Sequence, residues 1–102
     1  MNIINLTPHP VSVCQTDGTI RTIMPSEQPA RIASQTEPDE SDGKVMLYRR
    51  VGEFPVGVPE PVEGTIFIVS SVVKMWFREG RDDLVVPAYY DKALGACRGF
   101  WR

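Results

Sequence analysis

The sequence predicts an α+β fold: a small mixed sheet, mainly antiparallel or closed into a partial barrel, with one main helix over about residues 71–80 in a strand–helix–strand unit. Three observations predict it. Short segments in the N-terminal half alternate apolar and polar residues, as half-buried strands do. Residues 65–69 form an apolar run, which is typical of a central strand buried on both faces. Nine prolines and eight glycines indicate many turns between short elements.

The first predicted strand, residues 3–6, ends at the segment Thr7-Pro8-His9-Pro10. Because proline cannot donate a ladder hydrogen bond, we expect this piece at a sheet edge or in a bulge. Residues 11–14 and 20–24 both alternate, and the Asp17-Gly18 pair between them is a typical hairpin turn. These two segments are therefore predicted to form a β-hairpin.

The middle of the chain is predicted to be a loop at 25–29 and a short strand at 30–33. The acidic segment 36–44 is rich in turn residues, so we expect a mobile hairpin tip. A metal-binding loop is the alternative, but the segment lacks the aspartate spacing of calcium loops. Residues 45–48 resume a strand, and the proline-rich residues 54–61 are predicted to be an extended connector.

The predicted helix follows Ser70 and Ser71 and ends at Gly80, a plausible C-terminal stop. The apolar residues expected on one face are Val72, Val73, Trp76 and Phe77. The basic residues expected on a solvated face are Lys74, Arg78 and Arg81. A second apolar strand starts at residue 84, which leaves enough length for a right-handed parallel crossover. A turn over 89–95 and a strand over 96–101 complete the prediction.

Length and composition limit the classes of function. A chain of 102 residues is expected to be a single domain. Its net charge of −2 argues against general nucleic-acid binding, although a local basic patch stays open. The apolar run is about half the roughly 20 residues that span a bilayer, and no secretory signal is evident, so we expect a cytoplasmic protein without membrane contact. Cys14 and Cys97 share no motif spacing and are expected to be reduced.

Catalytic and metal-binding motifs are missing from the sequence. His9 is the only histidine, and nucleophilic catalysis would need it beside a cysteine or serine with a carboxylate behind it. Zinc would need three or four Cys or His ligands with paired spacing. We therefore expect no enzyme activity, no cofactor and no metal. An enzyme that uses His9 with Cys97 is the least favoured alternative.

Two places could bind a ligand. Ser70 and Ser71 stand where a helix start leaves backbone N–H groups free, so they either cap the helix or help to hold an anion together with Arg31 or Arg98. The C-terminal segment 98–102 combines arginines with Phe100 and Trp101. That mixture suits stacking on a base and pairing with a phosphate, or else an aromatic plug that closes the core.

Several motifs, taken in order, resemble those of small proteins encoded by bacteriophages and prophages. They are Asn5-Leu6-Thr7-Pro8-His9 and the segments 30–32, 59–61, 64–73, 81–87 and 95–100. The resemblance implies a small accessory protein, of a size that often counters host defence. Proteins of one such class bind cyclic nucleotide or cyclic ADP-ribose signals without cleaving them.

The leading hypothesis is thus a non-enzymatic homo-oligomer that sequesters a small phosphate-bearing signalling molecule. Oligomerisation is expected because one short chain has little surface with which to enclose a dinucleotide. The candidate ligand-binding residues are Ser70, Ser71, Arg31, Arg98, Phe100, Trp101, His9 and Thr7. The alternative is a protein-binding inhibitor of a host defence enzyme, whose acidic residues 37–42 contact a basic partner.

Overall fold

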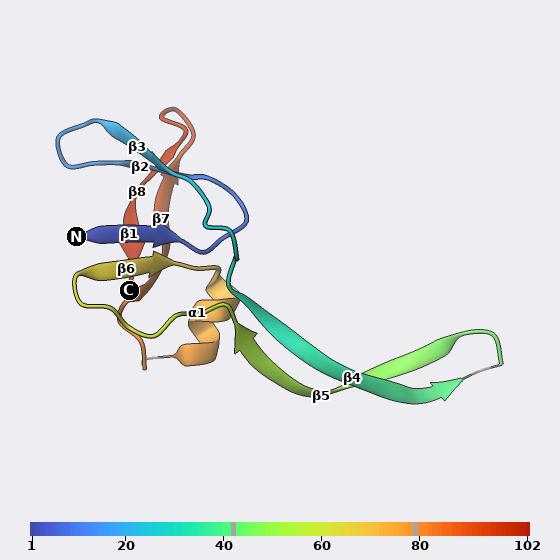
Figure 1. Cartoon of the computed structure of the whole chain (residues 1–102). Helices are drawn as coiled ribbons and strands as arrows, with labels where there is room; N and C mark the ends of the chain where they lie inside the picture. The colour runs from blue at the N-terminus through green and yellow to red at the C-terminus, as the bar shows by residue number, and fades with distance from the viewer. Residues whose placement is uncertain (42, 79) are drawn as a thin grey trace.

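Figure 1 shows the computed structural model of the protein, a body of short strands from which a long hairpin projects. The structure describes residues 1–41, 43–78 and 80–102. Its strands are β1 (Asn2–Asn5), β2 (Val11–Cys14), β3 (Ile20–Ile23), β4 (Arg31–Ser41), β5 (Met46–Val56), β6 (Thr65–Ile68), β7 (Leu84–Asp91) and β8 (Ala96–Trp101), and its helix is α1 (Ser71–Phe77). The prediction of an α+β fold is confirmed.

Six strands form the body in the order β1-β6-β7-β8-β2-β3. A bridge from Asn5 to Pro25 links β1 to the residues just after β3, so the sheet is nearly closed. In the described part of the chain, β6 pairs parallel with β1 and β7, and β2 pairs parallel with β8. Only β2/β3 and β7/β8 are antiparallel here, so the body is a mixed and nearly closed sheet, which agrees with the predicted partial barrel better than with a mainly antiparallel sheet. Distant segments pair, and local alternation could not reveal that.

The β2–β3 hairpin is confirmed, with Val11 opposite Ile23 and Cys14 opposite Ile20. At its turn, the Asp17 carboxylate accepts hydrogen bonds from the Thr19 hydroxyl at 2.6 Å and the Thr19 N–H at 3.0 Å. The bond from the Thr19 hydroxyl is the main reason why the pKa of Asp17 is lowered.

The core explains why the apolar run in β6 has no polar interruption. Phe67 and Val69 pack in a cluster that includes Val73 of α1, whereas Ile68 packs in a second cluster with Val85. Successive residues of a strand point to opposite faces, so β6 is buried on both of them. Its predicted central position is confirmed by pairing with β1 on one edge and β7 on the other.

Helix α1 lies between β6 and β7 in the chain and is shorter than predicted. It ends at Phe77, because Arg78 adopts a left-handed φ of 52° and its N–H donates back to Lys74 O and Met75 O. The buried side is set by Val73, with Phe77 partly buried against the same cluster. Val72 and Trp76 were expected on that face, but they are 61% and 42% exposed. Glu79 lies outside the described residues.

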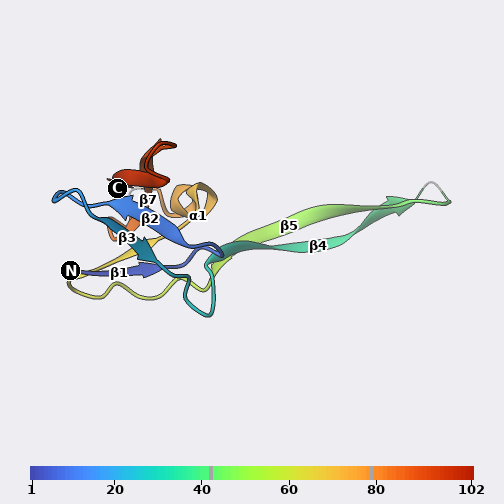
Figure 2. The same cartoon turned by 90° about the horizontal axis from the view of Figure 1, so that it is seen from above.

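Strands β4 and β5 form a separate two-stranded sheet, which we call the arm. Figures 1 and 2 show it leaving the body as a long narrow ribbon. Residues 36–41 belong to β4, so the prediction of a loop over 36–44 is wrong for most of that segment; Asp42 itself lies outside the described residues. Cross-strand pairing, such as Glu37 opposite Arg49, outweighs the turn preference of the local residues.

Two other boundaries also differ from prediction. The strand expected at 30–33 is only the beginning of β4, and residues 54–56 belong to β5 instead of to the connector. Residues 89–91 belong to β7, so the expected turn at 89–95 is confined to its second half.

At the root of the arm, Gly57 has a φ of +79°, and a Cβ there would lie 3.0 Å from Pro29 O. A side chain at this position would be crowded by the backbone of Pro29, and the positive φ would strain any residue other than glycine.

Candidate functional site

The start of α1 is capped as one of the two interpretations predicted. The Ser70 hydroxyl accepts a hydrogen bond from the Val73 N–H at 3.3 Å, and Ser71 is the first helical residue. Both serines are exposed. The structure therefore assigns Ser70 a capping role, which is worth about 1 kcal/mol in typical helices.

Thr7 and His9 belong to a turn organised by Asn5. The Asn5 side chain is 1% exposed. Its amide donates to His9 O at 2.8 Å and to Ile23 O at 2.9 Å, and its Oδ1 accepts from the Thr7 N–H at 2.9 Å and the Thr7 hydroxyl at 2.6 Å. The Asn-Leu-Thr-Pro-His motif thus ties β1 to the end of β3. His9 takes part through its carbonyl, while the residue itself is exposed.

The sequence placed Asn5 in a motif but assigned its side chain no role. A signal was available, because asparagine followed two residues later by threonine, beside a proline, is a usual composition for an Asx turn. The burial of the side chain depends on the closure between β1 and β3, which no local pattern indicates.

The remaining predicted ligand residues lie in two other places. Arg31 stands at the root of the arm, lines a hollow of about 250 Å³ with Glu27 and Gln28, and has no polar side-chain partner in residues 1–41, 43–78 and 80–102. Arg98 donates from Nη2 to Asp91 Oδ2 at 2.9 Å, and this bond is the main cause of the lowered pKa of Asp91.

The two aromatic candidates on β8 behave differently. Phe100 is half-buried and packs against the cluster that contains Val13 and Val85, as an aromatic plug would. Trp101 is exposed, and its ring centroid lies 5.0 Å from that of Tyr89. Among the described residues, no polar contact joins the serines at the start of α1 to Arg31 or Arg98. The eight predicted residues therefore do not form one site.

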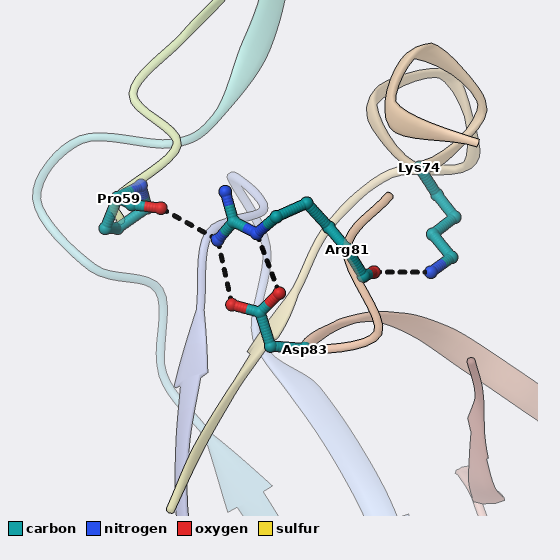
Figure 3. A network of polar contacts seen from close by, with 4 residues as sticks. All are labelled: Pro59, Lys74, Arg81 and Asp83. Atoms are coloured by element: carbon teal, nitrogen blue, oxygen red, sulfur yellow. Dashed lines mark hydrogen bonds and ion pairs between the residues drawn. The ribbon is translucent and has the colours of Figure 1, made fainter. Parts of the chain in front are cut away.

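Two of the basic residues assigned to a solvated helix face are structural instead. Figure 3 shows Arg81 gripping both carboxylate oxygens of Asp83 at 2.8 Å and donating also to Pro59 O at 2.8 Å. Lys74 donates from Nζ to Arg81 O at 2.9 Å. The Arg81 hydrogen bonds lower the pKa of Asp83, and the same bonds raise the pKa of Arg81. This network fixes the connector after the arm to the start of β7.

The arm exposes apolar side chains along its length. No residue in its described part, from Arg31 to Ser41 and from Met46 to Val56, is fully buried. Its exposed apolar residues are Met46, Leu47, Tyr48, Val51 and Phe54. Near the tip, Glu37 forms an ion pair with Arg49, whereas Asp39 and Glu40 have no ion-pair partner among the described residues.

A groove of about 480 Å³ runs between the base of the arm and α1. It is lined by Ile32 and Glu53 from the arm and by Val72, Met75, Trp76 and Arg78 from the helix segment. Met75 is 73% exposed, so the helix turns an apolar stripe toward solvent beside the arm. The Arg78 guanidinium has no polar partner among the described residues. The groove and the arm together are the candidate functional site.

Other site types find no support in the described residues. No three His, Cys, Asp or Glu side chains there are grouped to hold a metal ion, and Cys14 and Cys97 carry free thiols. No helix there has the length and apolar character needed to cross a bilayer. Comparisons with protein families, with curated proteins and with solved structures give no match to this chain.

Proposed function

We propose that this chain is a non-enzymatic protein-binding module that contacts its partner through the arm. The observation that carries the proposal is the exposure of apolar side chains along a hairpin that contacts the body only at its root. Two-stranded hairpins are marginally stable in water, because they bury little apolar surface. A contact that covers the arm would supply the missing burial.

The dimensions of the molecule support this reading. Its radius of gyration is 17.4 Å, whereas a compact chain of this length has about 13 Å. Its extents are 61 × 33 × 24 Å, and the arm accounts for the long axis in Figure 2. About a fifth of the residues lie in the arm, and among its described residues only Ile32 packs against a core cluster of the body. These dimensions leave a long exposed ribbon that a partner could cover, which supports the proposal.

The chemistry of the tip suggests how a partner is recognised. Asp39 and Glu40, which have no ion-pair partner among the described residues, lie near the far end, and apolar residues follow behind them. A partner with a basic rim around an apolar surface complements this order. For a phage accessory protein in the cytoplasm of a bacterial host, as the sequence motifs suggest, a host defence enzyme inhibited by surface contact is such a partner.

The test uses two valines with similar exposure. Val51 lies on the arm and Val62 lies on the connector of the body. We expect Val51→Lys to abolish complex formation in pull-down and sizing experiments, and Val62→Lys to leave it intact. Complexes that survive both changes equally would refute a binding role for the arm.

One observation favours the second candidate function, sequestration of a small phosphate-bearing molecule of the cyclic nucleotide or cyclic ADP-ribose type. Tyr89 is 69% exposed yet adopts a left-handed φ of 56°, which is strained for an aromatic residue. Its ring contacts Trp101, and the same β7–β8 hairpin carries Arg98, which uses one of its five N–H donors on Asp91. Rings and free guanidinium donors suit a base and a phosphate.

Calorimetry with a panel of cyclic nucleotides and cyclic ADP-ribose isomers tests this candidate. We expect binding heat that disappears in Trp101→Ala and persists in Trp76→Ala, since the second tryptophan lies on α1. The absence of heat with every member of the panel, from folded protein, would remove sequestration from consideration.

A further inference from the structure

We propose that the partner of the arm is a second copy of this chain. In this dimer two arms lie side by side and antiparallel, so that the tip of each arm docks at the groove between α1 and the arm base of the other subunit. The inference rests on the proposed function, because it also takes the arm as the contact surface, but it names a second subunit in place of a host enzyme as the partner. It names the occupant of a groove that a single subunit leaves open.

The length of the arm makes this arrangement self-consistent. Strands of 11 residues extend about 36 Å at 3.3 Å per residue. A two-fold axis at mid-arm places the tip of one arm beside the root of the other, and the reverse contact follows by symmetry. Such an isologous contact closes after two subunits. Two subunits therefore satisfy both grooves and both tips.

Charge favours the antiparallel alignment. Asp39 and Glu40 lie near the tip, whereas Arg31 and Arg78 lie at the root and at the end of α1. All four side chains lack an ion-pair partner among the described residues of one subunit. Antiparallel arms bring the acidic tip to the basic root, while parallel arms would place acids against acids. Opposite charge at both ends selects one register.

Apolar groups of the two subunits also meet where the tip of each arm reaches the groove of the other subunit. The groove offers Val72, Met75 and Trp76 from the exposed side of α1. Behind the acidic tip, the arm offers Leu47 and Tyr48, which is 65% exposed. Tyrosine and tryptophan are enriched among residues that anchor interfaces. Tyr48 is the side chain that we assign to the groove of the opposite subunit.

The arm is also large enough for this role. Stable interfaces use about 20–30 residues on each side. Strands β4 and β5 supply 11 residues each, and the helix stripe adds to them. A dimer through the arm therefore uses α1 and needs no further surface of the body.

A charge-exchange experiment tests the docking. Sedimentation equilibrium of the full chain is expected to show a dimer whose dissociation constant rises with salt. Glu40→Arg and Arg78→Glu should each weaken it at least about tenfold, and the double variant should regain most of the affinity. Arg21→Glu and Glu63→Arg, on exposed body positions, are the matched controls and should change little.

Trp76 gives a second readout. The chain contains two tryptophans, so Trp101→Phe leaves Trp76 as the single emitter. Its emission should shift to shorter wavelength as the concentration rises through the dissociation constant, and Tyr48→Ser should abolish that shift.

Two outcomes overturn the inference. A chain that stays monomeric at all concentrations, or a dimer that the charge exchange fails to restore, contradicts docking of tip into groove. The two proposals can be told apart in such a case. If Val51→Lys abolishes binding of a foreign protein and Val62→Lys does not, the arm is still a protein-binding surface. Only the assignment of a second subunit as its partner is then wrong.

Discussion

The body and the arm use the same kind of element for opposite purposes. Strands of the body are mostly short, and β6 buries Ile68 completely within four residues. Strands of the arm have 11 residues each, and none in the described part is buried. The body is thus held by packing between layers, whereas the arm is held by pairing between neighbours. Strand length alone says nothing about stability; coverage of the faces decides it.

Matched phenylalanines provide the strongest test of that contrast. Phe67 is 2% exposed in β6, and Phe54 is 48% exposed in β5. Phe67→Ala should lower the free energy of unfolding by about 3–5 kcal/mol, because it leaves a cavity. Phe54→Ala should cost under about 1 kcal/mol in the monomer. Urea denaturation at low protein concentration measures both, and equal losses would contradict the division between body and arm.

The next largest effect concerns closure of the sheet. Asn5→Ala removes four hydrogen bonds and leaves Ile23 O without the Asn5 donor. We expect a loss of about 3 kcal/mol, since buried groups would stay unpaired. Asn2→Ala, at the exposed start of the same strand, is the control and should cost little. Similar losses for the two asparagines would show that the Asn5 turn does not stabilise the body.

Acid should weaken the network that joins connector and body. Arg81 lowers the pKa of Asp83 below its ordinary value of 3.8. The folded state therefore takes up this proton less readily than the unfolded state, so the stabilisation is complete above about pH 4 and is lost as the pH falls through the lowered pKa. Asp83→Asn should cost about 2 kcal/mol at neutral pH and flatten the acid limb of the stability curve.

Asp82→Asn is the control for that measurement. Asp82 is the exposed neighbour of Asp83, and thermal unfolding followed between pH 2 and 7 should match the unmodified chain. A steep acid limb that persists in Asp83→Asn would assign the acid sensitivity to other carboxylates.

The smallest expected effect lies on the arm. The Glu37–Arg49 pair is about half exposed on both sides, so solvent screens it. Glu37→Gln should change the free energy of unfolding by under about 0.5 kcal/mol. Hydrogen exchange sharpens the comparison: arm amides should exchange faster than those of β6 at low concentration and gain protection as subunits associate. A cost above 1 kcal/mol for Glu37→Gln would show that the arm stabilises itself.

The sequence allowed the local elements to be predicted, but not the way in which they combine. Alternation found the β2–β3 hairpin, and the uninterrupted apolar run found β6, because each pattern depends on residues close together in the chain. The parallel pairing of β1 with β6 joins segments about sixty residues apart, and no periodicity records it. A hairpin was expected in this part of the chain, but its length was missed because Pro38 and the acids around it resemble a turn, while Tyr48 opposite Pro38 extends the strand.

The candidate site shows the same division. The cap at Ser70 was predictable from residue type and position. The groove was not, because Val72 and Trp76 fit an amphipathic helix equally well as buried residues. Which side of that helix meets the core depends on where β6 and β7 place it.

The crossing at the root of the arm has a mechanical consequence. Gly57 lies so close to Pro29 that each of the two chain segments restricts the movement of the other. Two residues further along the chain, the Pro59 carbonyl accepts a hydrogen bond from Arg81, which anchors the connector. An arm that is held in this way at its root has little freedom to change its angle to the body. The angle of the arm to the body, and with it the tilt of any paired subunits, therefore depends on the close approach at Gly57 and on the anchor at Pro59.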